Sequence, residues 1–330
     1  MTFSLTPQQK NAFHQAVSEL TDILQSKQVP LANAKQVATS IVSACGLVLD
    51  IDTSWINKIK VQDPSVLISS DNVSKIINIK DLISDSDVGK LAVWLSNQAF
   101  KLQPSAAGKG ELVSVLFAKN GMLKNAQQSG DTFEDSEDTE LKGDGGNITP
   151  ETDRQSGKRS EFSPLVEQLA ASFGYSNNER KKARFGKTDG RIIFTFEEHI
   201  NDNLNADQIE SILRLTLEES RSMFSTKDID TLISQTLKNR KYSFKQFCHH
   251  FALLNFKYYQ AQMKFTKMRL LSKNGDTLVV RNVTEFKQAI DDGLIRITLE
   301  HKDVKDGQGR FNTQVTLVSE KKRNANAKRK

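Results

Sequence analysis

The fold assignment depends most on residues 240–269, which read RKYSFKQFCHHFALLNFKYYQAQMKFTKMR. Cations and aromatic rings alternate along it without a proline or glycine. Apolar side chains recur every three or four residues and share one stripe, which comprises Phe244, Phe247, Phe251, Leu254, Tyr258, Ala261 and Phe265. That spacing is typical of an amphipathic helix with one buried face. The stretch therefore predicts a long helix.

The remaining faces of this predicted helix carry positive charge. They include Lys241, Lys245, Lys264 and Lys267. Lysines can neutralise phosphates, and rings left outside the stripe, Phe256 and Tyr259, could stack on bases. The alternative is that every ring belongs to the core and the lysines form an ordinary solvated face.

Composition bounds the class of protein. The chain has 330 residues, 37% of them hydrophobic, and a net charge of +6, which fits about two domains and a partner of negative charge. Its two cysteines, Cys45 and Cys248, lie far apart, so no disulfide framework is expected. The first residues show no signal peptide, and no apolar run is long enough to cross a bilayer. We expect a soluble cytoplasmic protein of a reducing compartment with no membrane partner.

Residues 1–128 predict a helical domain, a candidate for self-association. Thr6-Pro7 has the form of a helix start, with Thr6 as the cap. Further helices are predicted at about 32–49, 85–102 and 112–123.

Residues 129–163 differ in character. Nine acidic residues lie between Asp131 and Asp153 against the single Lys142, and apolar residues are few. Such a composition cannot bury enough apolar surface to offset the entropy of ordering. The segment predicts an acidic, disordered linker, and Thr132 and Ser136 within it would suit an acid-directed kinase.

After the linker, residues 164–271 predict a helical basic domain. Residues 272–319 predict a small β-α-β-β element packed on it, with a turn at Asn274-Gly275 and strands at 277–280, 294–300 and 313–318. Residues 320–330 form a basic tail. The fold class is thus mainly α with a small C-terminal α+β element, in two folded domains joined by the linker.

Motifs for catalysis are not evident. Gly186-Lys187-Thr188 lacks the earlier glycine of a phosphate-binding loop, because that position is Lys181. Cys248, His249 and His250 are consecutive, so on a helix they cannot face one metal ion. Acidic pairs at 197–198 and 218–219 bring no base or nucleophile. We therefore expect neither an enzyme nor a cofactor or metal.

Basic residues carry the functional prediction. The expected contacts with nucleic acid are Arg180, Lys181, Lys182, Arg184, Lys187, Arg191, Lys241, Lys245, Phe256, Tyr259, Lys264, Lys267, Lys321, Lys322, Arg323, Lys328, Arg329 and Lys330. They predict a non-catalytic structural protein of nucleocapsid or coat type that binds RNA or single strands through phosphates. In architecture, two folded modules on a flexible linker, the layout resembles viral nucleoproteins and polymerase-cofactor phosphoproteins. The alternative is an adaptor that recruits protein partners through the helical N-terminal domain and the acidic linker. The tail would also suit a nuclear import signal.

Overall fold

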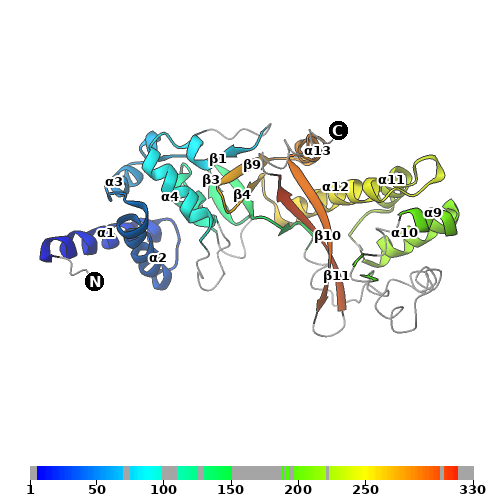
Figure 1. Cartoon of the computed structure of the whole chain (residues 1–330), viewed down its shortest axis with the longest axis horizontal. Coiled ribbons are helices and arrows are strands. Elements are labelled where there is room, and N and C mark those ends of the chain that lie inside the picture. Colours follow the sequence, from blue (N-terminus) through cyan, green and yellow to red (C-terminus); the bar gives the residue numbers. More distant parts are fainter. Residues whose placement is uncertain are drawn as a thin grey trace. The chain divides into compact units, whose positions relative to one another are not determined.

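A computed structural model describes residues 6–69, 75–98, 110–124, 130–150, 187–188, 191–192, 197–220, 223–304 and 308–318 (Figure 1). The chain forms two compact units, each built from segments far apart in sequence. Unit 1 comprises Met1–Asp144, Met263–Glu285 and Thr316–Lys330, and unit 2 comprises Gly145–Gln262 and Phe286–Val315. The units do not follow the predicted division into consecutive domains, because the chain returns to unit 1 after residue 262.

Four of the described helices of unit 1 begin within about one residue of the predicted starts, and the helix at Trp55–Lys60 was not predicted. The helices are α1 (Pro7–Ser26), α2 (Leu31–Ala44), α3 (Trp55–Lys60), α4 (Ser86–Ser96) and α5 (Glu111–Phe117), with short π or 3-10 turns at Cys45–Leu49, Pro64–Val66 and Ile79–Leu82. Thr6 caps α1 in a capping box with Gln9, and Asp85 caps α4 by accepting from the N–H groups of Asp87 and Val88.

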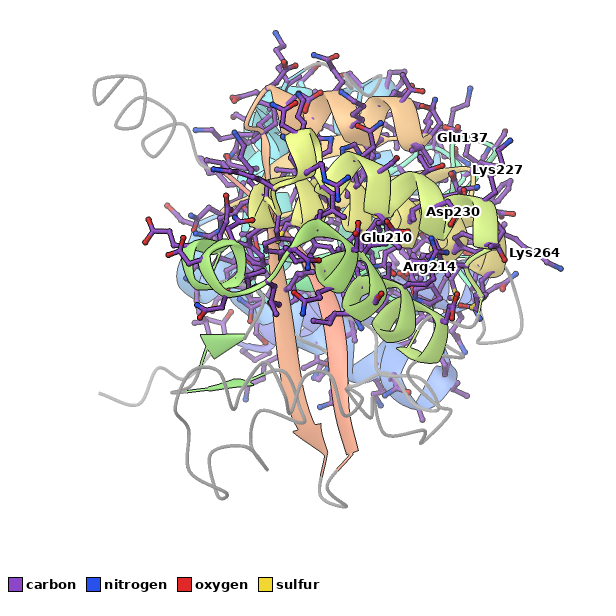
Figure 2. All side chains as sticks on the ribbon, turned by 90° about the vertical axis from the view of Figure 1, so that its right-hand side faces the viewer. Glu137, Glu210, Arg214, Lys227, Asp230 and Lys264 are labelled. Carbon is purple, nitrogen blue, oxygen red and sulfur yellow. The ribbon has the colours of Figure 1, made fainter. Side chains whose placement is uncertain are left out.

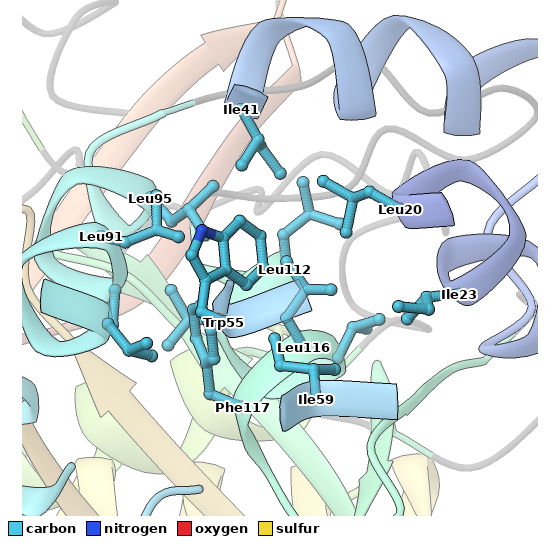
Figure 3. Packing of buried hydrophobic residues seen from close by; sticks show 14 of the residues in the cluster. Leu20, Ile23, Ile41, Trp55, Ile59, Leu91, Leu95, Leu112, Leu116 and Phe117 are labelled. Carbon is cyan, nitrogen blue, oxygen red and sulfur yellow. The ribbon is translucent and has the colours of Figure 1, made fainter. Parts of the chain in front are cut away.

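These helices enclose one apolar core (Figure 3). Trp55 lies at its centre, 2% exposed, among Leu20, Ile41 and Leu112. Its ring centroid is 6.4 Å from that of Phe117 on α5. Burial of such large apolar side chains is the main favourable term in folding this unit.

A six-stranded sheet completes unit 1. In spatial order its strands are β1 (Ile77–Asn78), β9 (Asp276–Val280), β8 (Lys267–Leu271), β4 (Glu137–Lys142), β3 (Thr132–Glu134) and β2 (Met122–Leu123). Strands β2, β3 and β4 form an antiparallel meander, β8 runs parallel to β4, and β8 pairs antiparallel with β9. The β8–β9 hairpin turns at Asn274-Gly275, where Gly275 has φ +82° and a Cβ would lie 2.8 Å from Val93. This turn requires glycine.

The predicted acidic linker is wrong for residues 130–150, which form β3, β4 and the edge strand β5 (Gly146–Asn147). Their charges are neutralised by a distant segment. Glu134 is fully buried, with its Oε1 3.1 Å from Nε of Arg269 and 3.3 Å from Nζ of Lys267. A carboxylate can be buried when it is paired and hydrogen-bonded. Residues 151–163 lie outside the described residues.

The predicted helix over 240–269 is shorter than expected. Helix α12 (Phe244–Met263) ends where Lys264 adopts a left-handed φ of 55°. The residues that follow form strand β8, in which Lys267 and Arg269 face one side of the sheet and Met268 and Leu270 the other. Phe265 is therefore outside the helix, and Ala261, expected to be inward, is exposed.

Unit 2 contains five described α-helices and a three-stranded main sheet. Its elements are α9 (Glu197–Asn203), α10 (Ala206–Ser220), α11 (Thr226–Thr236), the 3-10 turn Lys238–Arg240, α12, α13 (Val283–Asp291, in this unit from Phe286), β10 (Ile295–Val304) and β11 (Gln308–Leu317, in this unit to Val315). Strands β10, β11 and β5 form one sheet in that order, and β6 (Lys187–Thr188) pairs with β7 (Arg191–Ile192). The predicted strands at 294–300 and 313–318 are present, but β9 belongs to the other sheet, so residues 272–319 are not one element.

Helix α12 is buried on two faces. Phe247 and Phe251 pack into the apolar cluster with α10 and α11. On another face, the ring of Phe256 stacks on Phe286 of α13 with centroids 4.4 Å apart. A single apolar stripe accounts for only one of these faces, which is why the periodicity placed Phe256 outside.

Most of the described residues that have regular secondary structure lie in helices, in agreement with a mainly α class. None of the described helices is both long and apolar enough to span a membrane.

Candidate active site

Two carboxylates face each other across the β3–β4 hairpin. Thr132 pairs with Thr139, so one further step in the register places Asp131 opposite Glu140. The backbone supports this placement, because the N–H of Asp131 donates to the carbonyl of Thr139 at 2.9 Å. In addition, the N–H of Leu141 donates to Oδ2 of Asp131 at 2.9 Å, which fixes the Asp131 carboxylate over β4.

A lysine lies on the same face of β4. Lys142 is two residues after Glu140, so both side chains leave the strand on one side. Its Nζ is 2.5 Å from Oε1 of Glu140, and Glu140 is 1% exposed. The hairpin thus places two carboxylates and one ammonium together in a partly desolvated site.

Like charges and burial affect the Asp131 carboxylate. Burial and, to a smaller extent, the negative charge of Glu140 raise the pKa of Asp131, while Lys142 and the Leu141 N–H lower it; together they bring this pKa to about 6. Ionisation of both Asp131 and Glu140 therefore costs free energy when no cation is bound, and a bound cation would reduce this cost.

We expect Asp131→Asn to change how stability depends on pH. Because the folded state raises the pKa of Asp131 from 3.8 to about 6, it binds a proton more tightly than the unfolded state. The free energy of unfolding should therefore fall as pH rises through this window, with an upper limit of about 3 kcal/mol for one group. Denaturant unfolding of metal-free protein at pH 4.5 and 7 measures it. Asp131→Asn should remove its part of the change in the free energy of unfolding between these two pH values. If the variant shows the same change as the wild type, other groups cause it.

A third acidic residue, Glu111, lies in the first turn of α5 and is 9% exposed. Gly110 precedes it with φ +96°, and a Cβ there would lie 2.6 Å from Leu271 of β8. Glycine therefore lets this turn approach the end of the strand next to β4. Among the described residues, no group of three or more histidine, cysteine, aspartate or glutamate side chains is close enough to hold a metal ion by itself.

The two thiols are not suited to nucleophilic chemistry. Burial raises the pKa of Cys45 to about 11 and that of Cys248 to about 12. Both remain protonated at neutral pH, so neither supplies a thiolate.

Part of the predicted nucleic-acid surface is buried. Phe256, Tyr259 and Lys267 are 0%, 1% and 0% exposed. The two rings pack inside unit 2, and Lys267 lies among the carboxylates of Glu134, Asp135 and Glu137. The prediction that these three residues contact nucleic acid is therefore wrong, because stripe analysis assigned one buried face and overlooked strand β8.

Other predicted contacts are exposed or outside the description. Arg180, Lys181, Lys182, Arg184 and the tail residues Lys321, Lys322, Arg323, Lys328, Arg329 and Lys330 lie outside the described residues. Lys187 and Arg191 belong to the β6–β7 hairpin. Lys241, Lys245 and Lys264 are exposed, as is Lys238 nearby, and none of these four forms an ion pair with the described residues.

Several other cations of unit 2 are paired with carboxylates. Arg214 lies between Glu210 and Asp230, at 3.1 and 2.7 Å, on the surface of α10 and α11 (Figure 2). Arg240 pairs with Asp207 at 3.0 Å. The exposed positive charge is therefore less extensive than the sequence indicates.

Sequence reasoning missed the hairpin residues. It tested only adjacent carboxylates and treated 129–163 as spacer. The available signal was Glu140-Leu141-Lys142, in which charged side chains flank an apolar one as on a half-buried strand.

Comparison with known proteins adds no assignment: no family model matches the chain, and neither a curated protein nor a solved structure matches it.

Proposed function

We propose that this protein is a divalent-cation-dependent phosphodiesterase that acts on nucleic acid, with Asp131, Glu140 and Lys142 as its catalytic residues. The observation that carries the proposal is the position of these side chains on one face of the β3–β4 hairpin. Two carboxylates beside one ammonium are a suitable set for a reaction in which a phosphate is both bound and attacked.

The residues fit a hard cation. Carboxylate oxygens are the ligands that Mg²⁺ prefers, and Mg²⁺ is commonly held by one or two carboxylates together with waters and substrate phosphate. When bound, such an ion lowers the pKa of a coordinated water and polarises the phosphoryl oxygen.

The chain's own groups have separate tasks in this proposal. Asp131 and Glu140 would hold the ion, and the hydrogen bond from the Leu141 N–H fixes the orientation of the Asp131 carboxylate. The reaction would be hydrolysis, in which a water oxygen bonds to phosphorus, the bond from phosphorus to one sugar oxygen breaks, and that oxygen takes a proton from solvent. Lys142, whose ammonium contacts Glu140, would stabilise the negative charge of the phosphate in this step. No step of this scheme needs a thiol or an organic cofactor.

The test uses full-length protein with labelled single-stranded and double-stranded DNA and RNA, in Mg²⁺, Mn²⁺ or EDTA. Chain cleavage that depends on the added cation and is abolished by EDTA is expected. Binding without cleavage under every cation condition would overturn the catalytic proposal, provided that the protein is folded by circular dichroism.

That second outcome would favour the non-catalytic alternative, a nucleic-acid-binding structural protein. The observation in its favour is the exposed cationic turn of unit 2, formed by Lys238, Lys241 and Lys245. Such a turn would bind phosphates without sequence preference, and its affinity would fall with salt. If the protein binds no nucleic acid at all, the alternative of an adaptor for protein partners is favoured. Residues 130–150 would then contribute a folded element to that adaptor, in place of the predicted linker.

A further inference from the structure

An open pocket of about 430 Å³ lies in unit 1 on the same face of the sheet as the candidate site. It is lined by Ile23, Ser26, Lys27, Ile59, Lys60, Gln62, Asn120, Gly121, Met122 and Phe133. Phe133 of β3 is two residues after Asp131, which immediately precedes that strand, so their side chains leave the chain on one side, about 7 Å apart along it. Phe133 therefore places one wall of the pocket two residues along the chain from Asp131, although Asp131 and Glu140 are not among the residues that line the pocket.

Lys27 is the distinctive group in this pocket. Its Nζ donates to the carbonyl of Gly121 at 3.1 Å, and it forms no ion pair with the described residues. Burial lowers the pKa of Lys27, and no carboxylate offsets that effect. A half-buried ammonium that faces an open volume without a counter-ion would be stabilised by an anionic ligand.

The pocket also offers an apolar wall. Met122 pairs with Phe133 across β2 and β3, and Ile23 and Ile59 line the pocket beside Lys27. A ligand with a negative charge and a flat apolar ring would contact both the lysines and the apolar wall. The lysines would neutralise its charge, and the side chains of the wall would cover the face of its ring.

A simpler role for Lys27 is to cap helix α1, since it follows the last residue, Ser26. Capping would account for a bond to a helix carbonyl. The backbone N–H of Lys27 does cap α1, since it donates to the carbonyls of Ile23 and Leu24 at 3.1 and 3.2 Å. The side chain takes no part in this cap: its Nζ donates to Gly121, 94 residues away, and Lys27 lines the open pocket.

We propose that this pocket binds a nucleotide next to the one whose phosphodiester is cleaved, with its phosphate at Lys27 and Lys60 and its base against Phe133. The inference rests on the proposed function, because the proposed cleavage at Asp131 and Glu140 defines where the phosphodiester backbone of the substrate would lie. Lys60 is exposed at the end of α3, where it can approach the same phosphate.

The experiment uses full-length Glu140→Gln protein without divalent cation, so that binding is measured apart from cleavage. Methyl NMR of Ile23, Ile59 and Met122 reports on the pocket during titration with adenosine 5′-monophosphate, adenosine, inorganic phosphate or a short oligonucleotide. Adenosine 5′-monophosphate and the oligonucleotide should shift these methyl signals at millimolar or lower concentration, and adenosine and phosphate alone should bind about tenfold more weakly.

Lys27→Met should weaken binding of adenosine 5′-monophosphate by about tenfold or more. The matched control is Lys90→Met, which removes an exposed lysine paired with Asp87 on α4 and should leave binding unchanged. If Lys27→Met does not fold, Phe133→Leu tests the base contact in the same titration.

Two results would overturn the proposal: pocket methyl signals that do not respond to the nucleotide or the oligonucleotide, or a response that Lys27→Met leaves intact. Either result together with cation-dependent cleavage by the wild-type protein would reject the pocket alone. If the wild-type protein binds the nucleotide at the pocket but does not cleave nucleic acid, the catalytic proposal alone is rejected.

Discussion

Glu140→Gln is expected to reduce cation-dependent cleavage of nucleic acid by about 10³-fold. The substitution keeps the size of the side chain but removes the negative charge opposite Asp131 and beside Lys142. Affinity for the divalent ion should fall, while affinity for nucleic acid without the ion should be unchanged or higher, because one negative charge is removed from the site.

Glu137→Gln is the matched control. Glu137 lies on the same strand, three residues before Glu140 and on the opposite face, where its Oε1 is 3.3 Å from Nε of Arg281. The same chemical change should leave cleavage within about threefold of the wild type. Cleavage rates at saturating Mg²⁺ measure both variants. Retained cleavage in Glu140→Gln, or an equal loss in both variants, would remove Glu140 from the catalytic role.

Glu134→Gln is expected to lower the free energy of unfolding by about 3 to 5 kcal/mol. Glu134, Lys267 and Arg269 are all completely buried, and the Glu134 carboxylate lies 3.3 Å from the lysine and 3.1 Å from the arginine. Removal of its charge leaves two buried cations with less compensation, in a sheet where water cannot solvate them.

An exposed ion pair provides the comparison. Asp207 and Arg240 also lie 3.0 Å apart, but their side chains are 83% and 75% exposed. Asp207→Asn should change stability by less than about 1 kcal/mol. Denaturant unfolding of both variants measures the difference, and a similar small effect of Glu134→Gln would show that Asp135 and Glu137 replace it as partners of Lys267.

Local sequence signals were sufficient for many of the helices. Thr6-Pro7 and the helical pattern over 85–102 predicted helices that the structure contains, and the apolar run 277–280 after the turn signal Asn274-Gly275 predicted β9. Caps and turns act within a few residues, so they can be identified without knowledge of the tertiary fold.

The candidate site could not be identified in the same way. Asp131, Glu140 and Lys142 occur in a stretch whose composition is that of a disordered chain. Only the pairing of β4 with β8 changes that assessment, because it brings cations from residues 267 and 269 to the opposite face of the same sheet.

The sequence by itself determined the helical segments, the position of the hairpin turn and the overall positive charge. The tertiary structure decided which charges are buried, which rings of α12 are covered and which carboxylates meet. The physical reason is separation along the chain: Glu134 and Arg269 are 135 residues apart, so the free energy that permits their burial arises only when the sheet is assembled.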